Sequence, residues 1–335
     1  MISYPKKLRT NINNKKNFVE ATPFEEEAKK NISKESPKSL LTDIENIETT
    51  SNSDDFGAYD NNLNDLNNSK NIIEHPLEFL NKKFNKEYLD EIYINLLLDE
   101  KKFEKKVDPD YLSFQKSIND KMRAILVDWI IEIHCHYNFI TKTLFQCIFI
   151  IDAYLSKNIV DRNTLQLVGV TSLLISCKEN EIIYPSLNKF IQITDNAYTV
   201  EELKNMEKKI IKSLNFDILS PTAEEFFDIN AEYFNFTKNQ KSFGNFFLKC
   251  SLVDYNMLKY KQSTIAIACG YITMKYFNLE GVELIVDNVN FGIKQKEIKN
   301  CVKDLCFLVK DLYKSSLGVA KNIYINNKII TNYSE

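Results

Sequence analysis

The chain has 335 residues and a formal net charge of −3, with 44% hydrophobic and 27% charged residues, which is ordinary for a globular protein and long enough for two domains and a tail. Seven glycines and seven prolines are few for this length, so the composition disfavours Gly-rich nucleotide-binding folds and β-turn-rich folds and favours an all-α protein. The near-neutral charge argues against a protein whose main task is to grip nucleic acid.

The seven cysteines lie mostly in apolar runs and form no Cys-x-x-Cys pair. This pattern indicates buried thiols in a reducing compartment rather than a disulfide scaffold or a zinc site. The first ten residues, MISYPKKLRT, contain no apolar run long enough for a signal peptide.

Residues 1–84 have the composition of a disordered regulatory tail. Residues 1–19 contain five basic and no acidic side chains, whereas 20–80 contain fourteen acidic side chains against five lysines. Scattered apolar residues cannot offset the entropy of ordering such a segment. Thr22 and Ser36 each precede a proline, which makes them minimal sites for a proline-directed kinase.

An N-terminal helix and linker are expected over 85–118. Leu89, Ile92, Tyr93 and Leu96 recur at helical spacing and predict a helix over about 86–103. A polar linker follows.

The next segment, 119–137, carries two apolar stripes at helical spacing. One stripe contains Met122, Ile125, Leu126, Trp129, Ile130 and Ile133, and a second, nearly opposite stripe contains Ala124, Val127 and Ile131. A surface helix needs only one apolar face, so this helix is either buried on both sides or has a core face and a contact face.

An internal repeat with a period near 100 residues organises the remainder. Thr164–Cys177 and Gln262–Met274 are uncharged, and each is followed directly by a lysine, Lys178 and Lys275, which lie 97 residues apart. Both stretches are too short to cross a bilayer, so each predicts the central helix of a bundle. Capping boxes begin helices at Thr199 and Thr222. We therefore expect two similar five-helix domains, 119–220 and 221–324, followed by a C-terminal tail, 325–335.

No constellation of reactive residues is evident. The glycines form no phosphate loop, and neither Gly-x-Ser-x-Gly nor His-Glu-x-x-His occurs. The adjacent residues of His134-Cys135-His136 point about 100° apart on a helix and cannot share one metal ion. The sequence therefore predicts a protein that binds a partner and has no cofactor, metal or catalytic residues.

An ordered set of motifs resembles the mitotic cyclins of A and B type. The stretch Met122-Arg123-Ala124-Ile125-Leu126-Val127-Asp128-Trp129 resembles their signature, and order and spacing match over about 86–220 and more faintly to 324. The other matching pieces are Leu165-Gln166-Leu167-Val168-Gly169, Tyr184-Pro185, Ile193-Thr194-Asp195, Tyr198-Thr199, Met206-Glu207, Leu214-Asn215-Phe216, Asp254-Tyr255-x-Met257-Leu258 and Ser263-x-Ile265-Ala266.

The resemblance implies tandem cyclin-fold domains and an activating subunit of a cyclin-dependent protein kinase that controls the G2/M transition and mitosis. The partner would be the kinase catalytic subunit, bound as a heterodimer through a lysine and a glutamate on the first domain. The positions that match kinase-binding residues of the family are Lys178, Glu207, Ile175, Ile211, Phe216, Ile218, Tyr88 and Ile92.

The resemblance also implies a substrate-docking groove for Arg-x-Leu motifs of substrates or inhibitors, with an acidic residue that attracts their cation. This interpretation gives the double-striped helix a contact face. The matching groove positions are Met122, Ile125, Leu126, Trp129, Glu132, Leu165 and Gln166, and Arg123 and Asp152 match a structural ion pair.

A destruction box is expected in the tail, where Arg9, Ile12 and Asn17 match its spacing, with Ile12 in place of the usual leucine. It would recruit the anaphase-promoting complex and the ubiquitin machinery. The resemblance further implies residence in the nucleus and cytoplasm, with no binding to nucleic acid or membrane.

The sequence departs from the family pattern at several points. Glu179, Asn180 and Glu181 stand where an aromatic residue and two glutamates usually follow Lys178, and Gln262 replaces a proline before Ser263. These departures suggest a divergent member with an adapted kinase partner.

Two other classes of function stay open at this point. One is a cyclin-fold transcription factor or adaptor that binds nucleic acid or acts as a scaffold, which would need a basic face on the helical body. The other is an enzyme of unknown type, disfavoured because no reactive constellation was found.

Overall fold

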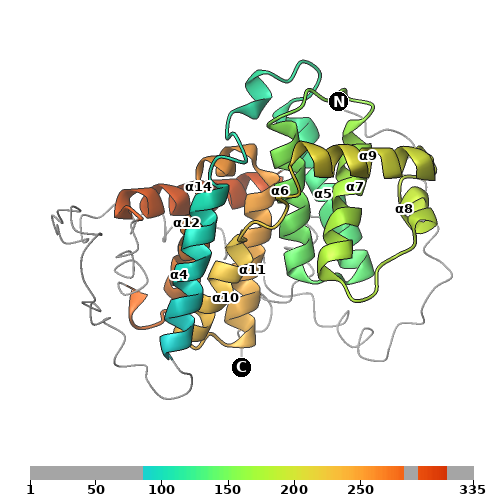
Figure 1. The fold of residues 1–335 in the computed structure, drawn as a ribbon. Coiled ribbons are helices and arrows are strands. Elements are labelled where there is room, and N and C mark those ends of the chain that lie inside the picture. Colours follow the sequence, from blue (N-terminus) through green and yellow to red (C-terminus); the bar gives the residue numbers. More distant parts are fainter. Residues whose placement is uncertain (1–85, 283–292, 315–335) are drawn as a thin grey trace, which may run out of the picture. The chain divides into compact units, whose positions relative to one another are not determined.

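The computed structural model describes residues 86–282 and 293–314, and every regular element in these ranges is helical (Figure 1). The chain divides into two compact units. In the described ranges the first unit holds residues 105–220, and the second holds 86–104 together with residues from 221 onward. The expected all-α architecture with two helical units is confirmed.

The first unit is organised around α7, Leu165–Asn180, which contacts helices on three sides. Residues 165–177 of α7 are buried except for Gln166, as expected for an uncharged central helix. Helix α7 packs against α5 (Asp120–Tyr137), α6 (Thr141–Leu155) and α9 (Val200–Ser213), and the unit also contains η2 (Tyr111–Ser113) and α8 (Leu187–Ile193).

The second unit repeats this arrangement around α12, Gln262–Tyr276, which packs against the helices that precede and follow it. Residues 263–274 of α12 are all buried. The other described elements of this unit are α4 (Lys86–Phe103), α10 (Ala223–Tyr233), α11 (Lys238–Val253), η3 (Tyr255–Lys259) and α14 (Gln295–Lys314). Residues 283–292 lie outside the described ranges.

Helix α4 packs in the second unit although it precedes the first in sequence. It contacts α10, and the ring of Tyr93 meets that of Phe226 edge-on with centroids 5.4 Å apart. The lead-in expected over 85–118 is thus divided in the structure, because 86–104 packs with the second unit and 105–118 with the first.

Side-chain caps define where several helices begin. The expected capping boxes at Thr199 and Thr222 are confirmed, since each threonine accepts from the backbone N–H of the glutamate three residues on, and that glutamate accepts in return. A third box, Thr237 with Gln240, starts α11 and was not expected. None of the helices described is long and apolar enough to cross a membrane.

Candidate protein-docking site

An ion pair joins the C-terminal turn of α7 to α9 in the first unit. The Lys178 Nζ atom lies 2.5 Å from the Glu207 Oε1 atom. The lysine side chain is 38% exposed and the glutamate side chain 17% exposed, so both remain accessible to a partner. The structure thus brings together two residues 29 positions apart that the sequence assigned to one site.

The apolar positions assigned to the same site differ in exposure. Phe216 is 75% exposed, while Ile211 and Ile218 are half-buried. Ile175 is only 3% exposed, so it offers little contact surface in the free chain. Phe216 is therefore the largest contact surface among these four side chains.

The backbone of Phe216 is left-handed, with φ of 63°, directly after Asn215 with φ of 53°. An asparagine tolerates this region, but a bulky aromatic residue rarely adopts it. The conformation is held by a hydrogen bond of 3.0 Å from the Phe216 N–H to the Ile211 carbonyl. Strain at a residue that exposes its ring to solvent is typical of a functional position.

Two isoleucines beyond α7 were missed by the sequence reasoning. Ile182 is 100% exposed and Ile183 is 88% exposed. Nearby, Glu181 Oε1 accepts from the Ile140 N–H at 2.9 Å and the Thr143 hydroxyl at 2.6 Å at the start of α6. Two adjacent apolar residues after a helix end are the signal that identifies this exposed segment.

On α4, in the second unit, the two residues assigned to kinase contact share one face. Tyr88 and Ile92 are four residues apart and are 62% and 48% exposed. They therefore form an accessible apolar pair in the free chain.

The two apolar stripes of α5 differ in burial. Val127 and Ile131 of the second stripe are at most 1% exposed, whereas Met122, Ile125 and Trp129 of the first remain half-buried. Ile130 and Ile133 of the first stripe are also buried, at 0% and 6% exposure, so helix α5 is buried on both sides along part of its length and keeps a partly exposed apolar strip at Met122, Ile125 and Trp129.

The remaining positions predicted for a docking groove differ in exposure. Glu132 and Gln166 are half-buried, whereas Leu126 and Leu165 are 6% and 5% exposed. A Cβ atom added to Gly169 of α7 would lie 2.7 Å from the Leu126 Cδ1 atom, so glycine permits close packing of α5 and α7 beneath the strip.

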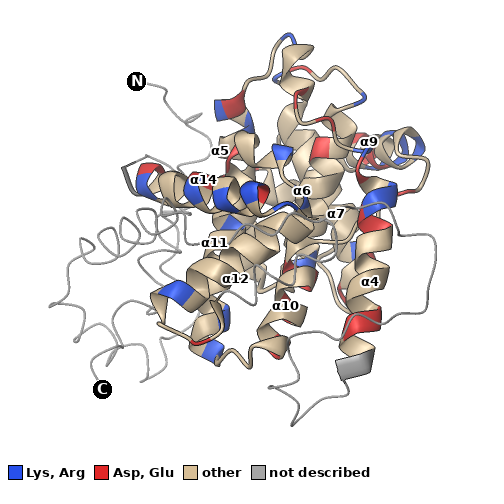
Figure 2. Cartoon of the chain, turned by 90° about the vertical axis from the view of Figure 1, so that its left-hand side faces the viewer, with Lys and Arg blue, Asp and Glu red and all other residues tan. Residues whose placement is uncertain are grey.

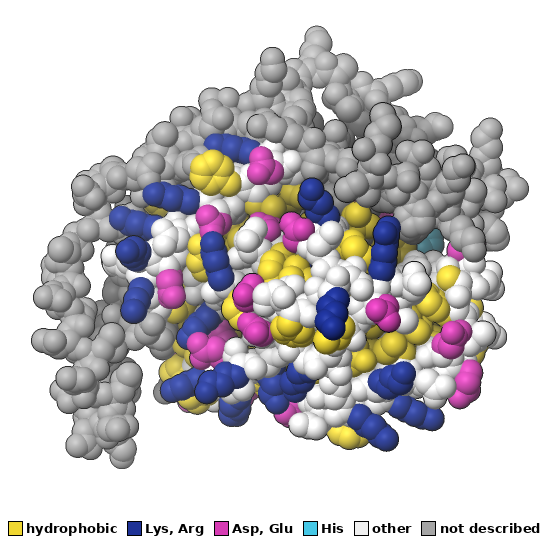
Figure 3. Space-filling view, turned by 90° about the horizontal axis from the view of Figure 1, so that it is seen from above, with side chains coloured by type: hydrophobic (Ala, Val, Ile, Leu, Met, Phe, Trp, Pro, Cys, Tyr) yellow, Lys and Arg dark blue, Asp and Glu magenta, His cyan; other side chains and the backbone are white. Residues whose placement is uncertain are grey.

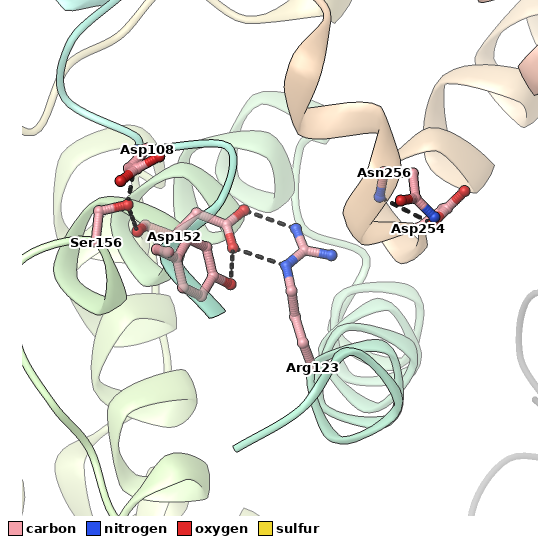
Figure 4. A network of polar contacts seen from close by, with 7 residues as sticks. Asp108, Arg123, Asp152, Ser156, Asp254 and Asn256 are labelled. Carbon is pink, nitrogen blue, oxygen red and sulfur yellow. Dashed lines mark hydrogen bonds and ion pairs between the residues drawn. The ribbon is translucent and has the colours of Figure 1, made fainter. Parts of the chain in front are cut away.

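Arg123 and Asp152 form a buried bidentate ion pair between α5 and α6 (Figure 4). The Arg123 Nε and Nη2 atoms each lie 2.7 Å from an Asp152 carboxylate oxygen, and the Tyr111 hydroxyl donates to the same carboxylate at 2.8 Å. Burial alone would lower the pKa of Arg123, but the charge of Asp152 and the hydrogen bonds outweigh it and raise that pKa. The pair is 1–2% exposed and is thus part of the core.

Metal-binding side chains and cysteines were compared with the sequence prediction in the part of the chain described. No group of three or more metal-binding side chains occurs there. Six of the seven cysteines are buried, and burial raises the pKa of Cys177 to about 12. In the cluster His134-Cys135-His136, the His134 ring nitrogen Nε2 lies 3.2 Å from the Ile140 carbonyl oxygen, which fits a packing role.

The tail positions lie outside the described residues. These are the destruction-box residues Arg9, Ile12 and Asn17 and the phosphorylation candidates Thr22 and Ser36.

Comparison with known proteins agrees with this architecture. Residues 91–219 match the family model described as cyclin, N-terminal domain, and residues 221–332 match cyclin, C-terminal domain. Together the two models cover most of the chain. The chain belongs to the cyclin family.

The sequence relatives are mitotic cyclins. The G2/mitotic-specific cyclin-B of Hydra viridissima is 30% identical over 88% of this chain and 75% of the relative. The G2/mitotic-specific cyclin-B of Hydra vulgaris is 33% identical over 73% of this chain and 66% of the relative, and cyclin-B2-1 of Oryza sativa subsp. japonica is 42% identical over 49% and 39%. The chain thus spans 39% to 66% of the length of these last two. The resemblance to mitotic cyclins is confirmed.

One solved structure supports the fold. A viral cyclin from herpesvirus saimiri superposes with a TM-score of 0.55 at 19% identity, over 63% of this chain and 96% of that one.

Proposed function

We propose that this chain is the activating regulatory subunit of a cyclin-dependent protein kinase and acts at the G2/M transition and in mitosis. The observation that carries the proposal is the Lys178–Glu207 pair, accessible at the end of the central helix of the first unit and accompanied by an exposed Phe216. Membership of the cyclin family supports it.

The chemistry of the site suits the capture of a helix. The ends of a helix have unpaired backbone N–H and C=O groups, and a lysine and a carboxylate side by side can satisfy both kinds. Burying Phe216 and the half-buried Ile211 against such a helix would add apolar contact. Holding a movable kinase helix in this way completes the Lys–Glu ion pair that a kinase active site needs.

In this proposal the chain has no catalytic residues, cofactor or metal, and contributes only surface. Phosphoryl transfer takes place on the kinase. The partly exposed strip of α5 serves a separate role, in which Met122, Ile125 and Trp129 receive the leucine of an Arg-x-Leu motif and Glu132 attracts its arginine.

We also propose removal of the chain by ubiquitin-dependent proteolysis, with Arg9, Ile12 and Asn17 recruiting the anaphase-promoting complex. Residence in the nucleus and cytoplasm is part of the same proposal. Replacing Arg9 and Ile12 by alanine should lengthen the half-life of the chain in mitotic cells and leave kinase binding unchanged. An unchanged half-life would exclude this degron.

Affinity purification of the intact chain, followed by identification of bound kinases and a histone-kinase assay on the eluate, tests the kinase proposal. We expect Lys178→Ala or Glu207→Ala to reduce both kinase recovery and activity by at least tenfold, because each removes one of the two groups that satisfy the captured helix end.

A matched control is available in the second unit. Lys241 and Glu232 form an ion pair of similar exposure, 30% and 41%, between α11 and α10. Lys241→Ala should leave kinase recovery unchanged. Equal losses in Lys178→Ala and Lys241→Ala, or full activity in Lys178→Ala, would contradict the proposal.

One surface favours a second candidate, binding of nucleic acid as a transcription factor or adaptor. Lys296, Lys299, Lys303 and Lys310 recur at helical spacing along α14, and Figure 2 shows basic segments in blue along this helix. Acidic side chains flank this row on the same helix, and on the face drawn in Figure 3 both signs of charge are interspersed with hydrophobic side chains. A salt-dependent gel shift with duplex DNA would support this second candidate.

A further inference from the structure

We infer that Glu100 is a positioning residue: it caps α12 of the second unit from α4, and thereby fixes α4 with Tyr88 and Ile92 turned toward a partner. This inference rests on the proposed kinase-binding function for the role of Tyr88 and Ile92. The anchoring itself stands on contacts within the second unit.

The contacts are short and buried. The Ser263 backbone N–H donates to the Glu100 Oε1 atom at 2.8 Å, and the Ser263 hydroxyl donates to the Oε2 atom at 2.7 Å. Glu100 is 9% exposed, and Ser263 is fully buried. Both oxygens of the carboxylate are therefore used, by a residue 163 positions away in sequence.

Helix α12 has no cap of its own at this end. Its N-cap residue, Lys261, makes no side-chain capping bond, so the first backbone N–H groups of α12 need an acceptor from elsewhere. Glu100 supplies that acceptor, and its negative charge suits the positive end of the helix dipole. Burial raises the pKa of Glu100, and the hydrogen bonds from Ser263, the charge of Lys261 and the Gln262 backbone N–H oppose this rise.

The contacts of Gln262 give a structural reason for one departure from the family pattern, the replacement of a proline by glutamine at this position. A proline at this position would have no N–H to offer, whereas the Gln262 N–H interacts with the Glu100 carboxylate. The Gln262 side-chain oxygen also accepts from the Ala223 N–H at 3.2 Å, where α10 begins. The substitution therefore strengthens the polar junction that receives α4.

Helix α4 separates its anchoring face from its displayed face. Asp90, Tyr93 and Glu100 lie three and seven residues apart, on one side of the helix, and Asp90 accepts from the Tyr233 hydroxyl of α10. Tyr88 and Ile92 lie on the other side and are exposed. Fixing one side to α10 and α12 sets the direction of the other before any partner arrives, which lowers the ordering cost of binding.

Amide hydrogen exchange on the intact free chain tests the anchoring. Glu100→Ala should accelerate exchange in α4 by about tenfold or more, because it leaves the Ser263 N–H without its acceptor. Glu100→Gln should stay close to the parent, since an amide oxygen still accepts that N–H and the serine hydroxyl can reverse its role. Lys101→Ala, at the exposed neighbouring residue, is the matched control and should change nothing.

A double-mutant cycle tests the functional consequence, with the affinity-purified kinase as the probe. Glu100→Ala should weaken kinase binding about tenfold in the parent and have little further effect when Tyr88 and Ile92 are already alanine. Unchanged α4 exchange, equal acceleration in α4 and α7, or independent additive losses would each overturn the inference. If the parent captures no kinase, the proposed function fails, while the exchange result still decides the anchoring.

Discussion

Each unit has a buried central helix with other helices packed on it, but the lead-in segments 105–118 and 86–104 are held by different chemistry. In the first unit, Tyr111 donates to Asp152, which is paired with Arg123. In the second unit, Tyr93 packs against the ring of Phe226. Arg123 is the fourth residue of α5 and Phe226 the fourth residue of α10, so one position of the repeat is filled once by a charge and once by an aromatic ring.

This difference shows which feature both units share, a large buried side chain, and which feature is found in the first unit, a buried ion pair. Both positions are at most 1% exposed, so the fold requires a large buried side chain that meets a lead-in tyrosine. The fold does not require charge, since Phe226 fills the position without it. A buried ion pair also carries a high desolvation cost, and apolar replacements of both partners are often neutral. The ion pair is therefore a property of the first unit alone.

Breaking the ion pair on one side should give the largest loss of stability. Asp152→Ala leaves the Arg123 guanidinium buried and unpaired, and we expect a loss of about 3–5 kcal/mol in the free energy of unfolding. Chemical denaturation of the intact chain measures it. Phe226→Ala in the second unit should cost a similar amount for a different reason, the loss of apolar burial and a cavity.

The double variant Arg123→Met with Asp152→Leu sharpens the comparison. If charge is dispensable at this position, the double variant should recover most of the stability lost in Asp152→Ala. A double variant as unstable as the single one would show that the first unit needs its ion pair, and would contradict the interpretation above.

Glycine packing gives the next largest difference between the units. A Cβ atom at Gly244 of α11 would lie 2.1 Å from the Phe227 Cζ atom, whereas one at Gly169 of α7 would lie 2.7 Å from the Cδ1 atom and 3.2 Å from the Cγ atom of Leu126. Gly244→Ala should therefore cost about 1–3 kcal/mol of unfolding free energy through overpacking. Gly169→Ala should cost clearly less, since Leu126 can shift, but it should weaken binding of an Arg-x-Leu peptide. Thermal unfolding and peptide titration measure the two effects, and equal losses of stability would contradict the argument.

The sequence predicted the helical repeat because its strongest signals are local. Uncharged runs at Thr164–Cys177 and Gln262–Met274 predicted the two central helices, and the structure buries both almost completely. The capping boxes were equally readable, because three-residue spacing is preserved from sequence to structure. Among the site residues, the resemblance to a family supplied Lys178 and Glu207, which local patterns alone would assign to a solvated helix end.

The features that the sequence did not predict depend on long-range contacts or on backbone conformation. Packing of α4 in the second unit rests on Glu100 and Ser263, 163 residues apart, and no local pattern encodes that pairing. The left-handed backbone of Phe216 follows from how α9 ends, and aromatic residues carry no propensity for it. Burial of Ile175 is a consequence of packing, which apolar character alone does not specify.

Substitution of Phe216 should lower kinase affinity without lowering the stability of the chain. Phe216→Gly should leave the free energy of unfolding within about 0.5 kcal/mol of the parent, because relief of the left-handed strain offsets the added freedom of the unfolded chain. Kinase affinity should fall at least fivefold, since an exposed aromatic contact is removed. Ile159→Ala, at another side chain of the first unit that is 60% exposed, is the control and should leave affinity unchanged. A Phe216→Gly chain that binds as tightly as the parent would exclude Phe216 from the interface.

The smallest expected effect concerns the charge of Glu100 in the second unit. Because burial raises its pKa above the ordinary 4.5, ionisation is harder in the folded chain than in the unfolded one. The contribution of Glu100 is therefore most favourable below the ordinary pKa and is lost as the pH rises through the raised value. The charge of Lys261 before α12 opposes this rise in pKa, and the charge of Glu100 in turn raises the pKa of Tyr93 on α4. Urea unfolding at several pH values should show the parent losing stability relative to Glu100→Gln as the pH rises above 4.5. If the parent instead gained stability over the glutamine variant in this range, the attraction between the Glu100 carboxylate and the N-terminus of α12 would outweigh the cost of burying the charge. The second unit would then also be stabilised by a buried charge.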